Sequence, residues 1–500
     1  MNCVVLGDIG WQYLYHLGDE AMTEAAIDLL QERGAEQVTL VAAQPHVAEK
    51  FYNRPAVARF GFSSKWSREK LERELDRVTG EMASGDSDLH KAVRKADAVI
   101  IAGGGNMNSE HAYHLYERLA FKRLAEAHSK PLFVSSQTIG PMLRPRDKEL
   151  VAEIIDYAEC FGAREPVSYQ LAIDLGGTPG RVVQTMDDAM MLRALPADEK
   201  YVSDLGLSPK FIVGSFTSHQ GDTGLTEEEY IASVTRTLDE LAAKLDADVA
   251  LAPHNGSLDT SARKGDQLLN DAIAEASTTG RLKSLEMPTA RQVVALTERA
   301  ILSISTRYHP TVFAPAAAVP TGSISLSYYS SVRMRGSMGN VGLKRYVVPA
   351  TSWHVASEAF VEMAERREAY ETHIGPIAES RHAYQSGWWD AIADAIKTRT
   401  WPMVENMQAV PELEPAGDWS VEVEHVTPVF DRFGQEKVWS KWFFQDRRAA
   451  WEERDRLAKQ SSTLTTTVKD LEKKLEAAVS RKAVRAADKL GTVARRITRR

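Results

Sequence analysis

The chain has 500 residues, of which 43% are hydrophobic and 26% are charged, and its formal net charge at pH 7 is −8. This composition is typical of a folded globular protein of two or three domains and excludes a fibre or a disordered chain. Its two cysteines, Cys3 and Cys160, exclude a disulfide framework and a cysteine-rich zinc module. No apolar run approaches the ~20 residues that span a bilayer.

The amino-terminal run CVVLG (residues 3–7) predicts a strand, and a glycine-containing loop over residues 8–20 leads into a predicted helix over residues 21–31. No basic stretch with an apolar run precedes this strand, so we expect a cytoplasmic protein without a signal peptide. Gly10 and Gly18 allow tight turns, and the amino end of the helix favours an anion at the loop. The glycine spacing fits neither a dinucleotide fingerprint nor a Walker motif.

The next strands are predicted at residues 37–42 and 96–102, separated by a charged, helical excursion over residues 51–89. The loop Gly103-Gly104-Gly105-Asn106 follows directly on the buried strand. Three glycines there offer close backbone approach and several free amide N–H groups, which can hold a phosphate or a carboxylate. The alternative is a tight strand-to-helix turn that packing requires.

The pattern of strands and helices continues to about residue 190. A strand over residues 131–136 ends in a loop with Gln137, which contacts a ligand or only satisfies the turn. Arg164 ends a further short apolar run, and a strand over residues 182–188 ends in Asp187 and Asp188. The repeated strand–helix alternation predicts a parallel, doubly wound sheet.

Residues 195–209 lose the apolar periodicity, so we place a domain boundary there. A second set of strands and helices begins at Phe211, and its strand over residues 300–305 runs into Arg307 and His309. Ligands of open parallel sheets sit beyond the carboxyl ends of the strands, where both side chains would lie. An arginine suits an anion and a histidine can pass a proton. Alternatively, Arg307 caps a helix or pairs with a carboxylate, and His309 is a satisfied loop histidine.

We therefore expect an α/β protein with two Rossmann-like domains that face a cleft, followed by a helical extension. The predicted boundaries are 1–195 and 210–380 for the two domains, 381–450 for a tryptophan-rich extension, 451–480 for a short coiled coil and 481–500 for a basic tail. Seven of the ten tryptophans follow residue 387 and are expected to pack the extension onto the domains; a sugar-stacking or membrane-interface role is the alternative. The heptad spacing of the coiled coil is kept by Leu457, Leu464, Val468, Leu471, Leu475 and Ala478.

The tail holds eight Arg or Lys residues and one Asp. Drawn as a helix, it places its apolar residues on one face and its basic residues on the other, which is typical of a segment that binds an anionic membrane surface. The apolar face comprises Ala483, Ala486, Leu490, Val493 and Ile497. Nucleic acid is a less favoured partner because the rest of the chain is acidic, and a frayed terminus is the remaining alternative because Gly491 weakens a helix by about 1 kcal/mol.

Six separated motifs, read in order, resemble the polysaccharide pyruvyl transferase family over residues 3–345. They are Gly18-Asp19-Glu20, Gly103-Gly104-Gly105-Asn106, Gln137-Thr138-Ile139-Gly140-Pro141, Arg164-Glu165, Asp188 and Arg307-Tyr308-His309. The resemblance implies a GT-B-like fold. It also implies transfer of the enolpyruvyl unit of phosphoenolpyruvate to two hydroxyls of a glycan or lipid-linked glycan, which gives a pyruvate ketal and phosphate. No cofactor is implied beyond this donor substrate.

The resemblance also assigns roles to residues. Arg164 and His309 are expected to contact phosphoenolpyruvate, and His309 is the better candidate for the general acid. The family has a lysine in a Tyr-x-x-Lys-x-x-Gly pattern; here Arg333 stands three residues before Gly336, and Tyr328 and Tyr329 are displaced. The residue pair His16-Leu17, which precedes Gly18-Asp19-Glu20, also differs from the sequence pattern of the family. Asp187 or Asp188 is expected to act as the base or to cap a loop. The further expected substrate-binding residues are Asp19, Gly103, Gly104, Gly105, Asn106, Gln137 and Arg307.

Two other functions stay open at this stage. One is a GT-B glycosyltransferase that uses a nucleotide sugar, and the other is a non-enzymatic, membrane-associated scaffold. A homo-oligomer through the coiled coil is also compatible with the heptad spacing. No metal-ligand cluster at a recognisable spacing occurs in the sequence, so we expect no metal site.

Overall fold

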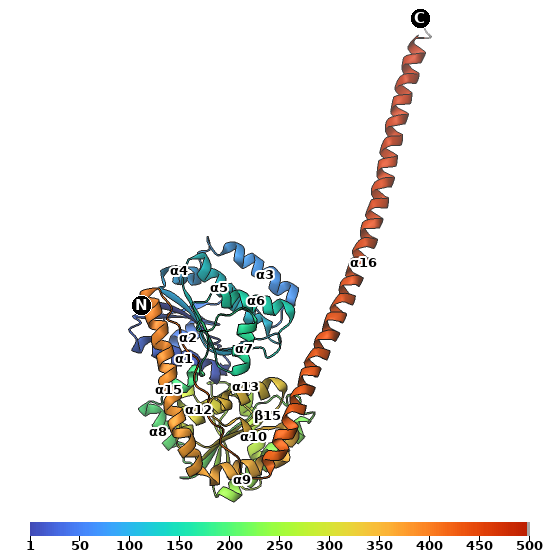
Figure 1. The fold of residues 1–500 in the computed structure, drawn as a ribbon. Helices are drawn as coiled ribbons and strands as arrows, with labels where there is room; N and C mark the ends of the chain where they lie inside the picture. Colours follow the sequence, from blue (N-terminus) through green and yellow to red (C-terminus); the bar gives the residue numbers. More distant parts are fainter. Residues whose placement is uncertain (498–500) are drawn as a thin grey trace. The chain divides into compact units, whose positions relative to one another are not determined.

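The structure, a computed structural model, describes residues 1–497. It forms two compact units, residues 1–434 and the chain from residue 435 onward. The first unit contains two parallel β-sheets with helices on both faces (Figure 1). The second unit is the continuation of one long helix, α16 (Trp419–Ile497). The α/β class and the pair of Rossmann-like halves that the sequence predicts are confirmed.

The first sheet has eight strands, seven of them in the order β4-β3-β1-β5-β7-β8-β9, with β6 paired to β7. All of its pairs are parallel, and its central strands are buried apolar runs such as VVL and AVII, as expected when helices cover both faces. The strands are β1 (Asn2–Leu6), β3 (Gln37–Ala42), β4 (Ala56–Ala58), β5 (Ala98–Ile101), β6 (Gly104–Met107), β7 (Leu132–Ile139), β8 (Cys160–Ala163) and β9 (Val182–Gln184).

The helices between these strands make the crossovers that parallel neighbours require. They are α1 (Leu17–Glu32), α2 (Pro45–Tyr52), α3 (Arg68–Glu81), α4 (Asp88–Lys95), α5 (Ala112–Ala127), α6 (Pro145–Tyr157) and α7 (Pro166–Asp174). The excursion expected over residues 51–89 therefore holds α3, half of whose residues are exposed, and the short edge strand β4, which the sequence did not predict.

The second sheet has the order β13-β11-β10-β14-β15-β16, again with parallel pairs only. Its strands are β10 (Phe211–Ser215), β11 (Asp248–Leu251), β13 (Leu282–Ser284), β14 (Leu302–Ser305), β15 (Thr321–Ser325) and β16 (Val347–Pro349). Its helices are α8 (Pro196–Asp204), α9 (Glu227–Leu245), α10 (Asp266–Ala276), α11 (Ala290–Glu298), α12 (Pro310–Ala316), α13 (Tyr328–Gly339) and α14 (Ala356–Glu365). Residues 195–209, where the sequence predicts a domain boundary, contain α8.

Two short strands connect the halves next to the cleft. β2 (Tyr15–His16) pairs antiparallel with β12 (Asn255–Gly256), and the backbone N–H of Leu17 donates to the carbonyl of His254 at 3.0 Å. The loop after β1 and the loop after β11 are thereby held against each other.

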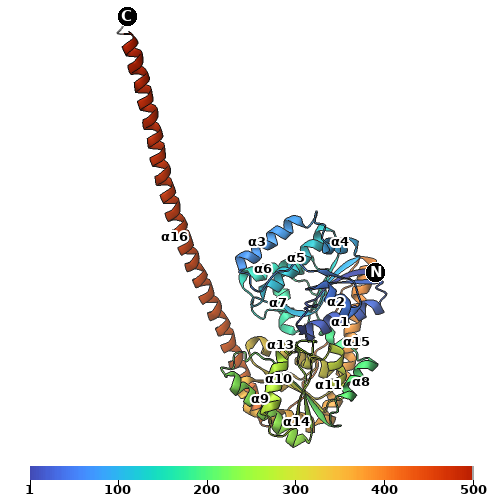
Figure 2. The same ribbon diagram turned by 180° about the vertical axis from the view of Figure 1, so that it is seen from behind.

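Helix α15 (Arg367–Thr398) runs along both halves, as Figures 1 and 2 show from opposite sides. Arg381 donates to the carbonyl of Asn340 at 2.8 Å, near the second sheet. Trp388 and Trp389 are buried against the first sheet, so the predicted packing role of the tryptophans is confirmed for these two. Trp439 and Trp451 of α16 are instead 59% and 53% exposed.

The part of α16 beyond residue 434 exposes the predicted heptad residues, for example Leu464 (64%) and Leu475 (64%). The coiled coil stays a prediction. The tail expected over residues 481–500 is helical up to Ile497; residues 498–500 and the side chains of Arg496 and Ile497, which the predicted amphipathic pattern uses, lie outside the described residues. Across residues 1–497, none of the helices combines the length and apolarity that crossing a membrane requires.

Candidate active site

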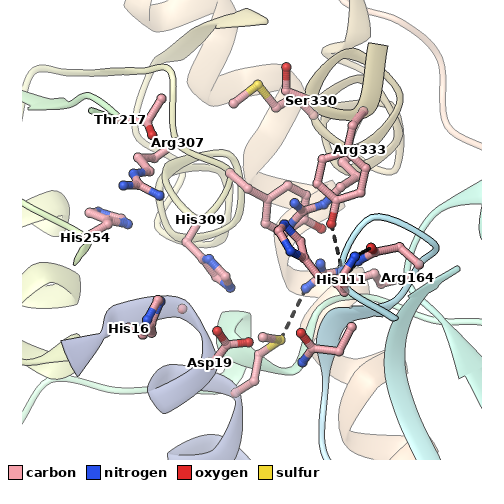
Figure 3. A pocket seen from close by; sticks show the side chains of 18 of the residues that line it. His16, Asp19, His111, Arg164, Thr217, His254, Arg307, His309, Ser330 and Arg333 are labelled. Atoms are coloured by element: carbon pink, nitrogen blue, oxygen red, sulfur yellow. Dashed lines mark hydrogen bonds between the residues drawn. The ribbon is translucent and has the colours of Figure 1, made fainter. Parts of the chain in front are cut away.

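A cavity of about 330 Å³ lies at the carboxyl ends of the strands of both sheets. The first half contributes the start of α1, strand β6, the start of α5 and the loop after β8. The second half contributes the loops after β10, β11 and β14, and helix α13 (Figure 3). Because parallel strands present their carboxyl ends at one edge of a sheet, residues far apart in the sequence meet here.

Three consecutive residues at the start of α1 have different environments. Gly18 lies directly against the imidazole of His309, where a Cβ atom would overlap the ring. Asp19 lines the cavity. Glu20 is turned away and buried, where it accepts hydrogen bonds from the hydroxyl of Tyr52 and, at 3.2 Å, from the N–H of Gly10. Burial raises the pKa of Glu20 to about 8, although these two hydrogen bonds act to lower it.

Arg164 is fully buried and held by acidic partners. Its Nη1 donates to Asp187 at 2.6 Å, and its Nε donates to Thr138 at 2.8 Å and to Glu165 at 3.1 Å. The guanidinium also lies 4.3 Å from the ring centroid of Tyr308. These contacts fix the side chain so that only Nη2 has no hydrogen-bond partner in the protein.

Arg333 of α13 is held by aromatic rings instead of carboxylates. Its guanidinium lies 4.4 Å from the ring centroid of Tyr308 and 4.7 Å from that of Tyr329. The hydroxyl of Tyr329 donates to the carbonyl of Gly105 at 3.1 Å, and a Cβ at Gly105 would come within 2.6 Å of this hydroxyl. A glycine is therefore needed at position 105 for α13 to approach β6. Among the cavity arginines of the described chain, Arg333 has no ion pair and keeps its charge for a ligand.

Arg307 lies at the opposite side of the cavity. It pairs with the buried carboxylate of Asp266, which also accepts the backbone N–H of His254 at 3.1 Å. The ion-pair alternative for Arg307 is thus correct, although the side chain also lines the cavity and its Nε has no partner.

Within residues 1–497, seven buried nitrogen atoms of residues that line the cavity have no hydrogen-bond partner. They belong to Asn106 (Nδ2), His114 (Nδ1), Arg164 (Nη2), His254 (Nε2), Arg307 (Nε), His309 (Nε2) and Arg333 (Nε). Buried donors are rarely left unpaired, since each costs about 1–3 kcal/mol. Such a concentration of donors at one cavity indicates a site for a ligand with several anionic oxygen atoms.

The surroundings of His309 favour the uncharged form of its imidazole. Burial, followed by the positive charges of Arg164, Arg333 and Arg307, places its pKa well below the usual value of 6.5. Its Nε2 lies 3.9 Å from the nearest carboxylate oxygen, which belongs to Asp187. The expectation of an acid with a pKa near neutrality is therefore wrong for the protein by itself. A bound anion would counter the three arginines and raise this pKa.

Asp19 has a raised pKa. Burial and the nearby Asp8 bring it to about 6, against the opposing effects of His16, Arg118 and Arg164. A carboxyl group with this pKa changes its protonation state near physiological pH, which suits acid–base chemistry.

Four of the predicted residues do not line the cavity. Asp188 is fully buried and accepts hydrogen bonds from Gln385 at 2.6 Å and from Trp389 at 2.7 Å, so it anchors α15 and cannot reach a substrate. Gln137 belongs to β7 and donates to the carbonyl of Ala102 at 2.5 Å. Gly103 and Gly104 pack against Met22 and Asn106.

The glycine loop also differs from the expectation. Residues 104–107 form β6, which pairs with β7, and the carbonyl of Gly105 accepts hydrogen bonds from Asn108 and Tyr329. This segment therefore pairs with β7 and contacts α13, and it does not form the expected loop of free amide groups. Of its residues, Gly105 and Asn106 line the cavity, together with the expected Asp19, Arg164, Arg307, His309 and Arg333.

The sequence reading assigned no binding role to several other lining residues. They are His16, His111, His114, His254, Thr217, Tyr308 and Tyr329. A signal existed for His254, which follows a strand of the second sheet just as His309 does. His111 and His114 lie at the start of the largely buried helix α5, where the sequence carries no such signal. Burial lowers the pKa of His114 to about 3. Within residues 1–497 no group of three or more His, Cys, Asp or Glu side chains is arranged to hold a metal ion.

The family model for polysaccharide pyruvyl transferases matches residues 16–328, a span that contains Asp19, Arg164 and His309. The chain belongs to the polysaccharide pyruvyl transferase family. The match ends before Arg333, the residue that stands in place of the family lysine in the sequence pattern. The comparison with curated proteins finds no match.

Solved structures with the same fold include nucleotide-sugar epimerases. The UDP-GlcNAc 2-epimerase of Neisseria meningitidis, bound to UDP-GlcNAc, is 14% identical, with 80% of this chain and 100% of that chain covered and a TM-score of 0.52. A Listeria monocytogenes protein described as a UDP-N-acetylglucosamine 2-epimerase is 14% identical over 82% and 100% of the chains, with a TM-score of 0.52. S. aureus MnaA with UDP is 12% identical over 82% and 100%, with a TM-score of 0.51. These similarities establish the GT-B-like fold only.

Proposed function

We propose that the protein transfers the pyruvyl group of phosphoenolpyruvate to two hydroxyls of a glycan, giving a pyruvate ketal and phosphate. Membership of the family supports a transferase that acts on a polysaccharide or its precursor. The observation that carries the donor assignment is the convergence on one cavity of seven buried nitrogens that have no partner among the described residues. Phosphoenolpyruvate has a phosphate and a carboxylate, which together offer enough anionic oxygens for these donors.

In this proposal Arg333 and Arg164 hold the donor. Arg333 is the cation without an ion pair, and Arg164 presents Nη2 from a guanidinium that Asp187 and Glu165 fix in place. Arg307 and His254 supply donors at the opposite side of the cavity. His309, which lies between the two sides, protonates C3 of the donor, so that C2 becomes electrophilic and accepts a hydroxyl oxygen.

The decisive experiment compares donors on the full-length protein. Thermal melts with phosphoenolpyruvate, UDP-sugars and GDP-sugars are expected to show stabilisation by phosphoenolpyruvate alone, since a ligand at 100 times its dissociation constant stabilises by about 2.7 kcal/mol. Phosphate release from phosphoenolpyruvate should then require an acceptor, for which we suggest a panel of aryl hexopyranosides. The product is identified by the methyl signal of a ketal in its NMR spectrum.

The alternatives predict different results in the same experiment. A glycosyltransferase would be stabilised by a nucleotide sugar and not by phosphoenolpyruvate, and a scaffold by neither. Either pattern would reject the proposed donor, whereas the fold and the family would stand.

We also propose that the enzyme acts at the cytoplasmic face of a membrane, where lipid-linked glycans would be its acceptors. Exposed basic side chains of α16, among them Arg481, Arg485 and Lys489, support attraction to anionic lipid. The exposed apolar residues at heptad spacing support pairing of α16 with a second copy.

A further inference from the structure

Asp19 is the carboxylate of the cavity that the protein leaves without hydrogen bonds. Among residues 1–497 no donor binds its side chain, whereas both oxygens of Glu20 and both oxygens of Asp187 accept hydrogen bonds. The protein thus places an unused acceptor at the first turn of α1, facing the cavity.

The position of Asp19 relative to His309 is fixed by the residue between them. The imidazole lies directly against Gly18, the immediate neighbour of Asp19. Figure 3 shows the Asp19 carboxylate and the His309 ring directed at the same part of the cavity from opposite walls. Asp19 comes from the first half of the chain and His309 from the second.

The first half of the chain lines the cavity with several polar side chains besides Asp19. They include His16, Asn108, His111 and Arg164, whereas Arg307 and Arg333 belong to the second half. A neutral polyhydroxyl compound is recognised by such amide, imidazole and carboxylate groups, whereas an anion is drawn to the arginines. Among the described residues that line the cavity, Asp19 is the carboxylate available to a glycan hydroxyl.

On the basis of the proposed function, we propose that Asp19 is the second catalytic residue, which takes the proton from the acceptor hydroxyl while His309 protonates the donor. The assignment replaces Asp188, which is sealed behind α15, and it differs from Asp187, whose oxygens are occupied by Arg164 and by the backbone of Ala189.

The protons balance in two steps with these two groups. In the first step the C2–C3 double bond takes a proton from protonated His309 at C3, the first hydroxyl oxygen bonds to C2, and Asp19 takes the hydroxyl proton. The product is a tetrahedral adduct that still carries phosphate. In the second step the C2–O bond to phosphate breaks, its electron pair and the Asp19 proton leave with the phosphate, the second hydroxyl oxygen bonds to C2, and neutral His309 takes its proton. Both side chains then return to their starting states.

The electrostatics around both groups are compatible with this exchange. Asp19 faces Asp8, His16, Arg118 and Arg164, which together with burial hold its pKa at about 6, so it is mostly ionised at neutral pH. His309 faces Arg164, Arg333, Arg307, His254 and Asp187. A bound trianionic donor offsets the arginines, which favours a proton on His309 when the reaction starts.

The test uses the full-length enzyme with phosphoenolpyruvate and an aryl hexopyranoside that supports wild-type turnover. Asp19→Asn is expected to lower kcat by at least 100-fold, to leave phosphoenolpyruvate affinity equal or tighter, and to remove the acidic limb of the kcat–pH profile. Asp19→Ala should regain at least 10-fold of its lost rate when formate is added, because formate can occupy the space and accept the proton. Glu20→Gln is the matched control: it makes the same carboxyl-to-amide change one residue away, outside the cavity, and should keep kcat within threefold of wild type.

The outcomes separate this inference from the proposed function. If wild-type enzyme turns over and Asp19→Asn keeps kcat within threefold, the assignment of Asp19 is overturned while the donor stands. A loss of activity in Asp19→Ala that formate does not restore also overturns it, since a purely structural role would give that result. If wild-type enzyme does not use phosphoenolpyruvate, the proposed function itself has failed.

Discussion

The imidazole of His309 lies against the Cα of Gly18, with no room for a side chain between them. Gly18 is the second residue of α1 in the first half of the chain, and His309 precedes α12 in the second half. The two halves therefore meet at the proposed general acid. The glycine is required by this contact and not by a left-handed backbone, since its φ is not positive.

Replacement of Gly18 by alanine tests this contact. The added methyl group overlaps the ring of His309, so the ring must move away from its present place beside Gly18, 3.9 Å from Asp187. We expect Gly18→Ala to lower kcat by about 100-fold. Because alanine favours a helix over glycine by about 1 kcal/mol, the variant should still fold. Turnover and thermal melting, measured on the same preparation, check both expectations; full activity would show that the His309 position is unimportant.

Binding of the donor should be coupled to proton uptake by His309. Burial, and then Arg164, Arg333 and Arg307, keep the pKa of His309 well below 6.5, so the ring is neutral at pH 7. A group whose pKa rises on binding strengthens binding at low pH, and affinity is lost as pH rises through the pKa of the complex. We expect the dissociation constant for phosphoenolpyruvate to increase above pH 7 by up to tenfold per pH unit.

Calorimetry in buffers of different ionisation enthalpy counts the protons directly. Wild-type enzyme should take up as much as one proton per donor bound at pH 7, and His309→Gln should take up fewer. An equal uptake in both proteins would assign the proton to another group, such as Asp19.

An arginine at position 333 should bind the donor more tightly than a lysine at the same position. The guanidinium is held over Tyr308 and Tyr329 at 4.4 and 4.7 Å, and lysine lacks the planar fork that these contacts position. Loss of its charge-assisted hydrogen bonds should cost about 1.5–3 kcal/mol, so Arg333→Ala is expected to weaken phosphoenolpyruvate binding by about 10- to 150-fold. Arg333→Lys should lie in between. Titration calorimetry checks the order; wild-type affinity in Arg333→Ala would remove this residue from the site.

The sequence was sufficient to predict the fold and much of the site because the signals are local. Each buried strand is an apolar run, and Arg164, Arg307 and His309 each follow such a run, so the rule that ligands lie beyond strand ends brings them together. Family motifs added Asp19 and Arg333. Local patterns of this kind need no knowledge of which strands are neighbours.

The predictions from sequence are wrong where the position of a residue depends on three-dimensional packing. Gln137 was expected in a loop, but β7 continues to Ile139 because β6 adds a further partner beside it. Asp187 and Asp188 are adjacent in sequence, and only the position of α15, almost 200 residues later, shows that Asp188 is sealed by Trp389 and Gln385. The depressed pKa of His309 depends on three arginines from two halves of the chain, and no local pattern contains that information.

Asp188 should matter for stability and not for turnover. Asp188→Ala leaves the indole N–H of Trp389 and the amide of Gln385 without their acceptor, which should lower the free energy of unfolding by about 1–3 kcal/mol. Asp188→Asn keeps an oxygen for both donors, so its kcat should stay within threefold of wild type. Urea denaturation and phosphate release measure the two effects, and loss of turnover in a stably folded Asp188→Asn would restore it as a catalytic base.

The end of α16 is expected to attach the enzyme to anionic membranes. The helix continues to Ile497, with Val484, Leu490 and Val493 exposed to 60%, 70% and 53%. Basic residues near an anionic surface contribute about 1 kcal/mol each, and salt screens this attraction. Full-length protein should therefore float with vesicles that contain anionic lipid, much less with neutral vesicles, and less as ionic strength rises from 0.1 to 0.5 M, a range over which the Debye length falls to roughly half of its ~10 Å. A chain that ends at residue 480 should not float with either kind of vesicle.

The matched control is the triple variant Arg481→Gln, Arg485→Gln and Lys489→Gln. It keeps the helix and its apolar residues while it removes three charges, so its partition to anionic vesicles should fall between those of the full-length and shortened proteins. Equal flotation of full-length and shortened protein would eliminate the membrane role of this segment.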